Sequence, residues 1–175
     1  MKSNFQKIDF VLFNWYHTQS YEMPWRNSSN PYKIWISEIM LQQTQVSTVK
    51  PYYLNWIKKF PTVKAVANSN IDDILKAWEG LGYYKRAQNI YESSEIILKN
   101  FNGHIPDNYK DLISLKGIGD YTASAILSIA YNQPYPVFDG NIKRVISRLY
   151  KLKNQKDILE KSKKTITMCM QSVNP

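Results

Sequence analysis

The sequence predicts an all-α protein, an orthogonal bundle of helices joined by short links. Apolar residues recur at helical spacing almost throughout the 175 residues, and no sustained alternation indicates strands. Prolines, asparagines and glycines stand where helices would begin and end. No heptad run is long enough to predict a coiled coil, and the chain contains no internal repeat.

Four helices are expected in the first half of the chain, over residues 4–18, 32–49, 51–60 and 70–79. Asn30-Pro31 is typical of a helix cap followed by proline in the first turn. Asn70, with two aspartates in the next turn, predicts another helix start, and Gly80 and Gly82 predict its end.

The second half of the chain is expected to hold five helices, over residues 83–101, 107–115, 120–131, 139–152 and 156–171. Residues 132–138 contain two prolines and predict an extended segment between the last two helices and the rest. All six glycines lie between Gly80 and Gly140, so unusual backbone geometry is expected in the middle of the chain.

Composition favours a polyanionic partner. The chain carries 23 lysines and arginines against 14 aspartates and glutamates, a formal net charge of +9. Many basic proteins bind no nucleic acid, so charge alone does not decide the partner. The 13 tyrosines and five tryptophans suit both core packing and stacking on bases.

Cysteine and histidine usage argues against a disulfide framework or a cysteine-based metal site. Cys169 is the single cysteine, and His17 and His104 are far apart in the sequence. The first 18 residues predict an amphipathic helix rather than a signal peptide, and no apolar run reaches membrane-spanning length. We therefore expect an intracellular protein that is not bound to membranes.

Residues 112–130, LISLKGIGDYTASAILSIA, are the segment around which the rest of the chain is expected to be organised. Gly117 and Gly119 allow a tight turn and close approach of another molecule. Asp120 is expected to cap the second helix, whose first amides would suit a phosphate oxygen. A plain tight connection between two helices explains the same spacing equally well.

Two carboxyl groups are candidates for chemistry. Glu38 stands in the apolar run IWISEIML, where burial would favour a protonated carboxyl able to act as a general acid. Alternatively, Glu38, Gln42 and Gln45 form the solvated face of an amphipathic helix. Asp139 precedes a helix and is either simply an N-cap or an anion held opposite a developing cation.

Six segments, in this order, resemble the catalytic domain of MutY-type adenine DNA glycosylases, and the resemblance covers nearly the whole chain. They are PWR (24–26), PYKIWISEIMLQQTQV (31–46), FPTV (60–63), WEGLGYYKRAQN (78–89), LKGIGDYTA (115–123) and FDGNIKRV (138–145). The resemblance implies the helix–hairpin–helix glycosylase fold in two lobes. Residues 20–136 would form a six-helix barrel lobe with the hairpin at 112–130, and residues 1–19 with 137–175 a second lobe.

The resemblance assigns catalytic roles to four residues. Glu38 matches the glutamate that protonates the adenine ring, and Asp139 matches the aspartate that stabilises the oxocarbenium-like sugar. Tyr121 matches a tyrosine beside that aspartate, and Asn141 matches an amide that orients the site. Ordinary helix packing would equally explain Tyr121.

DNA contacts are implied for six further residues. Gln43 and Tyr83 match residues that wedge into the duplex once the adenine has left the stack. Arg26 matches a pocket arginine in some members, although it could equally contact phosphate, and Gln43 could be an ordinary surface residue. The hairpin residues that would bind the DNA backbone are Gly117, Gly119 and Thr122.

The implied activity is hydrolysis of the N-glycosidic bond of adenine mispaired with 8-oxoguanine or guanine, by a nucleoid-associated, cytoplasmic monomer acting on double-stranded DNA. An endonuclease III-like lyase is the nearest rival. That chemistry needs a lysine amine, which that family places where this chain has Tyr121. Lys116 and Lys143 are nearby amines that leave a weak lyase activity open.

A DNA-binding remnant without turnover is the second rival. Members of the family continue into four closely spaced cysteines that hold a [4Fe-4S] cluster, and usually into a domain that recognises 8-oxoguanine. The cluster is implied by the family, but its cysteine ligands are absent from these 175 residues, and Cys169 does not match the motif. We therefore expect an incomplete second lobe in which apolar faces lack cover. The apolar residues that would lack part of their cover are Phe5, Ile8, Leu12 and Trp15. Reduced stability and a tendency to aggregate should follow.

Overall fold

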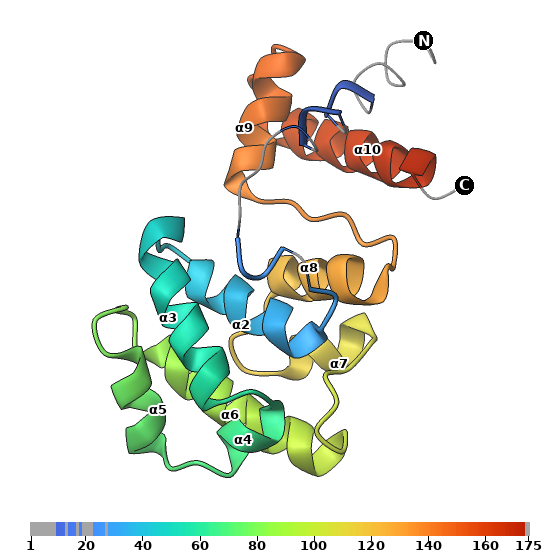
Figure 1. Ribbon diagram of the computed structural model, residues 1–175. Coiled ribbons are helices and arrows are strands. Elements are labelled where there is room, and N and C mark those ends of the chain that lie inside the picture. Colours follow the sequence, from blue (N-terminus) through green and yellow to red (C-terminus); the bar gives the residue numbers. More distant parts are fainter. Residues whose placement is uncertain (1–9, 13, 17, 19–22, 27, 174–175) are drawn as a thin grey trace. The chain divides into compact units, whose positions relative to one another are not determined.

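The computed structural model describes residues 10–12, 14–16, 18, 23–26 and 28–173, and the regular elements in these residues are all helices (Figure 1). The prediction of an all-α fold is therefore confirmed. The helices are α2 (Pro31–Leu41), α3 (Val46–Lys59), α4 (Val63–Ala67), α5 (Ile71–Trp78), α6 (Lys85–Asn100), α7 (Tyr109–Ser114), α8 (Asp120–Tyr131), α9 (Gly140–Leu149) and α10 (Gln155–Val173).

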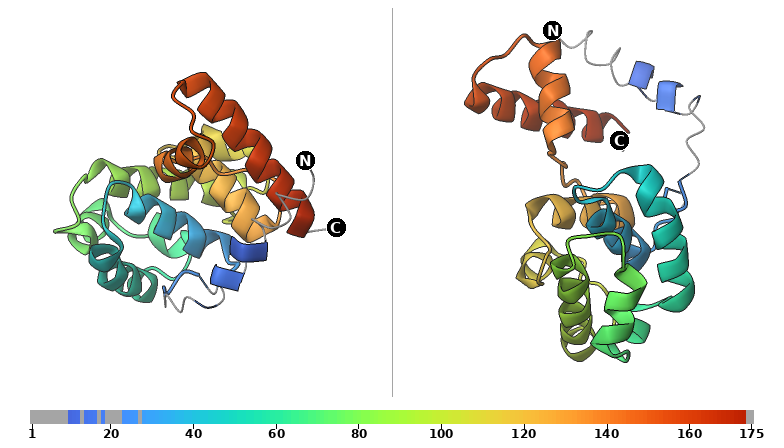
Figure 2. Two further views of the ribbon diagram at one scale, coloured as in Figure 1. Left: turned by 90° about the horizontal axis from the view of Figure 1, so that it is seen from above. Right: turned by 90° about the vertical axis from the view of Figure 1, so that its left-hand side faces the viewer.

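The chain divides into two compact units. The core unit is Met23–Gln133 and contains α2 to α8. The second unit contains α9 and α10, in the segment that begins at Pro134, together with the described residues before Met23. In the second unit, α9 and α10 pack against each other, which the views of Figure 2 show from two further sides.

Helix α2 occupies the centre of the core unit, where it packs against α3, α6 and α8. Trp35, Trp56 and Trp78 are buried, and the rings of the last two meet edge to face with centroids 5.5 Å apart. Trp56 Nε1 donates a hydrogen bond to the hydroxyl of Tyr32, which in turn donates to the carbonyl of Phe60 at 2.6 Å. The buried polar atoms of Trp56 and Tyr32 are thus paired, which offsets the cost of removing them from water.

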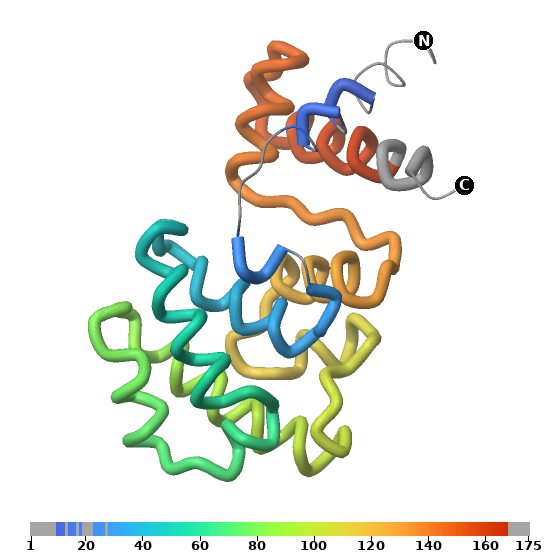
Figure 3. The backbone as a smooth tube through the Cα atoms, in the orientation of Figure 1, coloured from blue at the N-terminus to red at the C-terminus, as the bar shows by residue number. Residues whose placement is uncertain are grey.

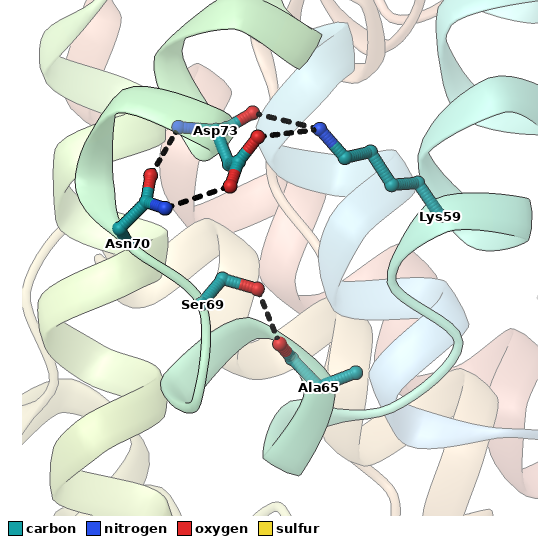
Figure 4. A network of polar contacts seen from close by, with 5 residues as sticks. All are labelled: Lys59, Ala65, Ser69, Asn70 and Asp73. Carbon is teal, nitrogen blue, oxygen red and sulfur yellow. Dashed lines mark hydrogen bonds and ion pairs between the residues drawn. The ribbon is translucent and has the colours of Figure 1, made fainter.

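Asparagine caps set several helix starts, as the sequence predicts for Asn30 and Asn70. The Asn30 side chain accepts from the Lys33 amide, and Pro31 follows at the first helical position. Figure 4 shows the start of α5, where Asn70 accepts from the Asp73 amide at 2.7 Å and donates to its carboxylate at 2.8 Å. Lys59 approaches the same carboxylate at 3.2 Å, and hydrogen bonds from Lys59 and Asn70 lower the pKa of Asp73.

The predicted helix over residues 32–49 is wrong. Helix α2 ends at Leu41, and α3 begins at Val46 and continues through Pro51. Residues 42–45 read QQTQ and contain neither proline nor glycine, so no local stop signal in the sequence marks the break. A buried side chain from α6 holds the carbonyl groups at the end of α2, as described below.

Further elements also differ from expectation, among them α9, which ends at Leu149 rather than at residue 152. Asp120 is not the cap of α8, because Gly119 is the N-cap and Asp120 is the first helical residue; its carboxylate accepts from the Tyr109 hydroxyl at 2.8 Å. Helix α4 follows a Thr62 cap and was not expected. Helix α6 begins at Lys85 rather than at residue 83.

The expected first helix, 4–18, lies mostly outside the described residues, and the residues described within it are helical. Leu12 and Trp15 are about half exposed, at 53% and 54%, whereas Phe5 and Ile8 lie outside the described residues. A search of the described helices finds none with the length and apolar character that crossing a bilayer requires.

Candidate nucleic-acid interface and catalytic residues

The connection between α7 and α8 is a tight hairpin over residues 115–119, which can be followed along the tube of Figure 3. Leu115 and Ile118 are buried, and the Ile118 amide donates to the Leu115 carbonyl at 3.2 Å. These apolar side chains anchor the hairpin in the core unit. The backbone between and beyond them is left exposed at Lys116, Gly117 and Gly119.

The two hairpin glycines are required for different reasons. Gly117 has a φ of +78°, and a Cβ there would lie 2.9 Å from Asn89 of α6. Its lack of a side chain therefore serves internal packing. Gly119 has an ordinary φ of −97°, and a Cβ would meet nothing within 4 Å. Nothing in the described structure requires glycine at residue 119, whereas close approach of an external group would.

Helix α6 holds the hairpin from one side. Lys116 forms an ion pair with Glu92, and the Ser93 hydroxyl donates to the Lys116 carbonyl at 3.1 Å. The hydrogen bond from Lys116 lowers the pKa of Glu92. Because Ser93 is fully buried, its contact fixes the hairpin backbone more firmly than the exposed ion pair does.

The first turn of α8 carries Tyr121 and Thr122. Helix geometry leaves the amides of a first turn without intrahelical acceptors, which makes them available to an anion. The Thr122 side chain is buried and its hydroxyl accepts from Gln42 Nε2 at 3.4 Å. The backbone of Thr122, rather than its hydroxyl, is thus the part suited to a phosphate. Tyr121 is 39% exposed.

Gln43 and Tyr83 share an unusual backbone conformation. Both are in the left-handed region, with φ of 56° and 50°, and both side chains are exposed. A non-glycine residue in this region costs about 1–3 kcal/mol and persists only where its surroundings impose it. Gln43 follows the end of α2 and Tyr83 lies between α5 and α6, so two loops of the core unit each present one such residue.

Glu38 lies in α2 between the buried residues Ser37 and Ile39 and is itself half-buried. The sequence allows either a buried Glu38 or a solvated face formed by Glu38, Gln42 and Gln45. The structure lies between these alternatives, because Gln42 is also half-buried and Gln45 alone of the three is exposed. Arg26, also in the core unit, is exposed.

Asp139 is the N-cap of α9, as its position before the helix predicts. Its Oδ1 accepts from the Ile142 amide at 2.7 Å, and its Oδ2 accepts from Asn141 Nδ2 at 2.8 Å. Asn141 Oδ1 in turn accepts from Arg144 Nη2 at 2.8 Å. The carboxylate is thereby fixed in orientation while remaining half-buried rather than enclosed.

The predicted site residues therefore fall into two groups. Asp139 and Asn141 are brought together in the second unit, while Glu38, Gln43, Tyr83 and the hairpin belong to the core unit. Convergence of Glu38 and Asp139 on one nucleoside stays a prediction.

Arg86 lies inside the segment WEGLGYYKRAQN, yet no role is predicted for it from the sequence. Its side chain is 8% exposed and contacts the two loops that carry Gln43 and Tyr83. One signal was available: a cation in the first turn of α6 is unfavourable for the helix dipole, so a compensating contact was to be expected.

The residues present do not fit a [4Fe-4S] cluster. Such a cluster is held by four cysteine thiolates, and the sequence contains one cysteine. Among the described residues, no group of three or more histidine, cysteine, aspartate or glutamate side chains is placed to hold a metal ion.

Curated relatives of this chain are adenine DNA glycosylases. The chain is 50% identical to the enzyme of Buchnera aphidicola subsp. Baizongia pistaciae over 152 residues, 86% of this chain and 43% of that protein. It is 39% identical to the human enzyme over 147 residues, 79% of this chain and 27% of that protein. The chain spans less than half the length of these relatives.

Solved structures show the same fold at low identity. A thermostable thymine-DNA glycosylase matches with a TM-score of 0.81 and 21% identity, covering 98% of this chain and 86% of that chain. Endonuclease III in a trapped covalent intermediate with DNA matches with a TM-score of 0.73 and 20% identity, covering 98% and 78%. The family model described as "HhH-GPD superfamily base excision DNA repair protein" matches residues 36–171. On this match and the helix–hairpin–helix between α7 and α8, the chain belongs to the HhH-GPD superfamily of base excision DNA repair proteins.

Proposed function

We propose that this chain is the catalytic domain of an adenine DNA glycosylase that removes adenine mispaired with 8-oxoguanine or guanine from double-stranded DNA. The observation that carries the proposal is its identity of 50% with a curated adenine DNA glycosylase over 86% of the chain. The net charge of +9 and the exposed hairpin glycine at residue 119 support a DNA partner. Action on chromosomal DNA would place the protein at the nucleoid.

The proposed reaction divides the work between two carboxyl groups. Glu38, protonated, gives its proton to the adenine ring, and the bond between C1′ and the base nitrogen then breaks with its electron pair going to the base. Asp139, as a carboxylate, stabilises the positive charge that develops on the sugar. Water adds to C1′ and loses a proton, leaving an abasic site and free adenine.

DNA binding is proposed to use the hairpin and the two left-handed residues. Backbone amides around Gly119 and the first turn of α8 would bind phosphate oxygens. Gln43 and Tyr83 would occupy the space left when the adenine leaves the stack, and Arg26 would line the base pocket or bind phosphate. Asn141 orients Asp139 by its 2.8 Å hydrogen bond, and Tyr121 would lie beside the sugar.

A glycosylase assay on a duplex with adenine opposite 8-oxoguanine tests the proposal. Free adenine and an abasic strand that breaks only on alkali treatment are the expected products. Nicking without alkali would instead favour the lyase rival, for which Lys116 and Lys143 are the available amines. Tight binding with no product would favour a DNA-binding remnant.

A further inference from the structure

The guanidinium group of Arg86 is a buried junction between two loops of the core unit. Nη1 lies 3.0, 2.9 and 2.6 Å from the carbonyl oxygens of Ile39, Met40 and Gln42, at the end of α2. Nη2 lies 3.1 Å from Thr44 Oγ1, and 3.3 and 3.2 Å from the carbonyl oxygens of Leu81 and Gly82. One side chain thus holds the α2–α3 loop and the α5–α6 loop together.

The groups that Arg86 contacts are chain neighbours of Gln43 and Tyr83. Gln42 and Thr44 are the neighbours of Gln43, and Gly82 immediately precedes Tyr83. The Arg86 Cζ also lies 5.3 Å from the centroid of the Tyr83 ring and 5.3 Å from the centroid of the Trp78 ring. Hydrogen bonds from the same guanidinium group therefore fix the carbonyl groups that precede Gln43 and Tyr83, and so hold both residues in the left-handed conformation.

Ion pairing does not explain the burial of this charge. Within the described part of the chain, no carboxylate pairs with Arg86, and its partners are all neutral oxygens and aromatic rings. A cation at the C-terminal end of α2 is favourable for the helix dipole, which partly offsets its desolvation. A planar group with several donors is needed to reach two loops at once, and lysine cannot replace that geometry.

We propose that Arg86 is a positioning residue that sets the spacing and direction of the Gln43 and Tyr83 side chains, so that both enter the duplex as one rigid unit when adenine is extruded. This inference rests on the proposed function, since it takes those two residues to be the wedges. Arg86 itself would contact neither DNA nor the reacting atoms. It would act on base extrusion through Gln43 and Tyr83, which enter the duplex.

The test measures base extrusion separately from binding and folding. The full chain is mixed with a duplex that carries 2-aminopurine in place of the target adenine, because the fluorescence of this base rises when it leaves the stack. Arg86→Lys keeps the charge but loses most of the hydrogen bonds. We expect the extruded fraction, and kcat for adenine release, to fall about tenfold, with duplex Kd changed less than about threefold.

Two further variants separate positioning from stability. Thr44→Val removes one acceptor of Arg86 without exposing backbone, so it should lower extrusion about threefold while the Tm stays near that of the unchanged protein. Arg148→Lys is the matched control, an exchange of the same kind at an exposed arginine of α9, and should leave extrusion unchanged. If Arg86→Lys does not fold, Thr44→Val decides, and normal extrusion by it would overturn the proposal.

A double-variant comparison links Arg86 to the wedges. In a protein that already carries Gln43→Ala and Tyr83→Ala, Arg86→Lys should cause no further loss of extrusion. An equal loss in that background would show that Arg86 acts elsewhere. If the unchanged protein releases adenine and Arg86→Lys extrudes normally, this inference alone fails. If the unchanged protein neither extrudes 2-aminopurine nor releases adenine, the proposed function fails and this inference with it.

Discussion

At the scale of single residues, the carboxylates have distinct surroundings. Asp139 is held on both oxygens by the Ile142 amide and by Asn141, whereas Glu38 lies half-buried in α2 between Ser37 and Ile39. An oriented anion and a less hydrated carboxyl are the two states that cleavage of a bond to an anomeric carbon needs. The roles that the family resemblance implies for the two residues stay predictions.

Removing either carboxyl function should abolish catalysis while sparing binding. Glu38→Gln cannot give a proton, and Asp139→Asn carries no charge although its oxygen can still accept from the Ile142 amide as a cap. We expect adenine release to fall at least about a hundredfold for each. Single-turnover release of adenine measures the effect, and duplex affinity is the control. Near-normal turnover would remove the assigned role from the residue concerned.

At the scale of elements, the helix–hairpin–helix is both packed internally and open to a ligand. The Gly117 side of the hairpin contacts Asn89 of α6, while Gly119 faces open space. Ser93 and Lys116 attach the hairpin to α6, and Gln42 connects the end of α2 to Thr122 at the start of α8. The hairpin backbone is consequently held by two helices other than its own.

Alanine at each hairpin glycine should give opposite results. Gly117→Ala places a methyl group 2.9 Å from Asn89 at a φ of +78°, so it should lower the Tm by several degrees. Gly119→Ala fits the folded chain and should leave the Tm nearly unchanged, yet weaken duplex binding by about tenfold because it blocks a phosphate. Thermal melts and fluorescence anisotropy measure the two effects. Unimpaired binding by Gly119→Ala would argue for a plain connection.

The start of α5 makes stability depend on pH in a predictable direction. The pKa of Asp73 is lowered in the folded state by Lys59 and Asn70 (Figure 4). Its contribution is thus present above the unfolded aspartate pKa of about 3.9 and is lost as the pH falls through the lower folded value.

Asp73→Asn should therefore lower the Tm slightly at pH 7, and the difference from the unchanged protein should vanish in acid. The effect is small because both partners are about half exposed. Asp72→Asn is the matched control, since it removes the same charge from the same helix turn. Equal pH profiles for the two variants would show a helix-dipole effect rather than the contact with Lys59.

The sequence was sufficient where local signals act alone. Asn30-Pro31, Asn70 and Asp139 each cap a helix through their own side chain, and these starts were predicted. It was insufficient where a distant residue decides. The end of α2 at Leu41 depends on Arg86, which is 45 positions later in the chain, and no periodicity reports that contact. Pairing of Glu38 with Asp139 likewise depends on tertiary structure, and it stays a prediction.

At the scale of the whole molecule, the charge of +9 is expected to dominate association with DNA. Affinity for a mispaired duplex should fall by roughly one to three orders of magnitude between 50 and 200 mM salt, through release of counterions. Titrations by anisotropy measure the slope, and a fully paired duplex should show a similar one. A flat response would contradict a phosphate-dominated interface.

The distribution of tryptophans gives the two units different optical signatures. Trp25, Trp35, Trp56 and Trp78 are buried in the core unit, Trp15 is exposed, and neither α9 nor α10 contains one. Four of the five tryptophans lie in the core unit, so intrinsic emission reports mainly on that unit, while circular dichroism records helices of both. Two non-coincident transitions by these probes would reveal that the units unfold separately. Since Arg86 lies against Trp78, the emission maximum also provides a label-free monitor of that junction.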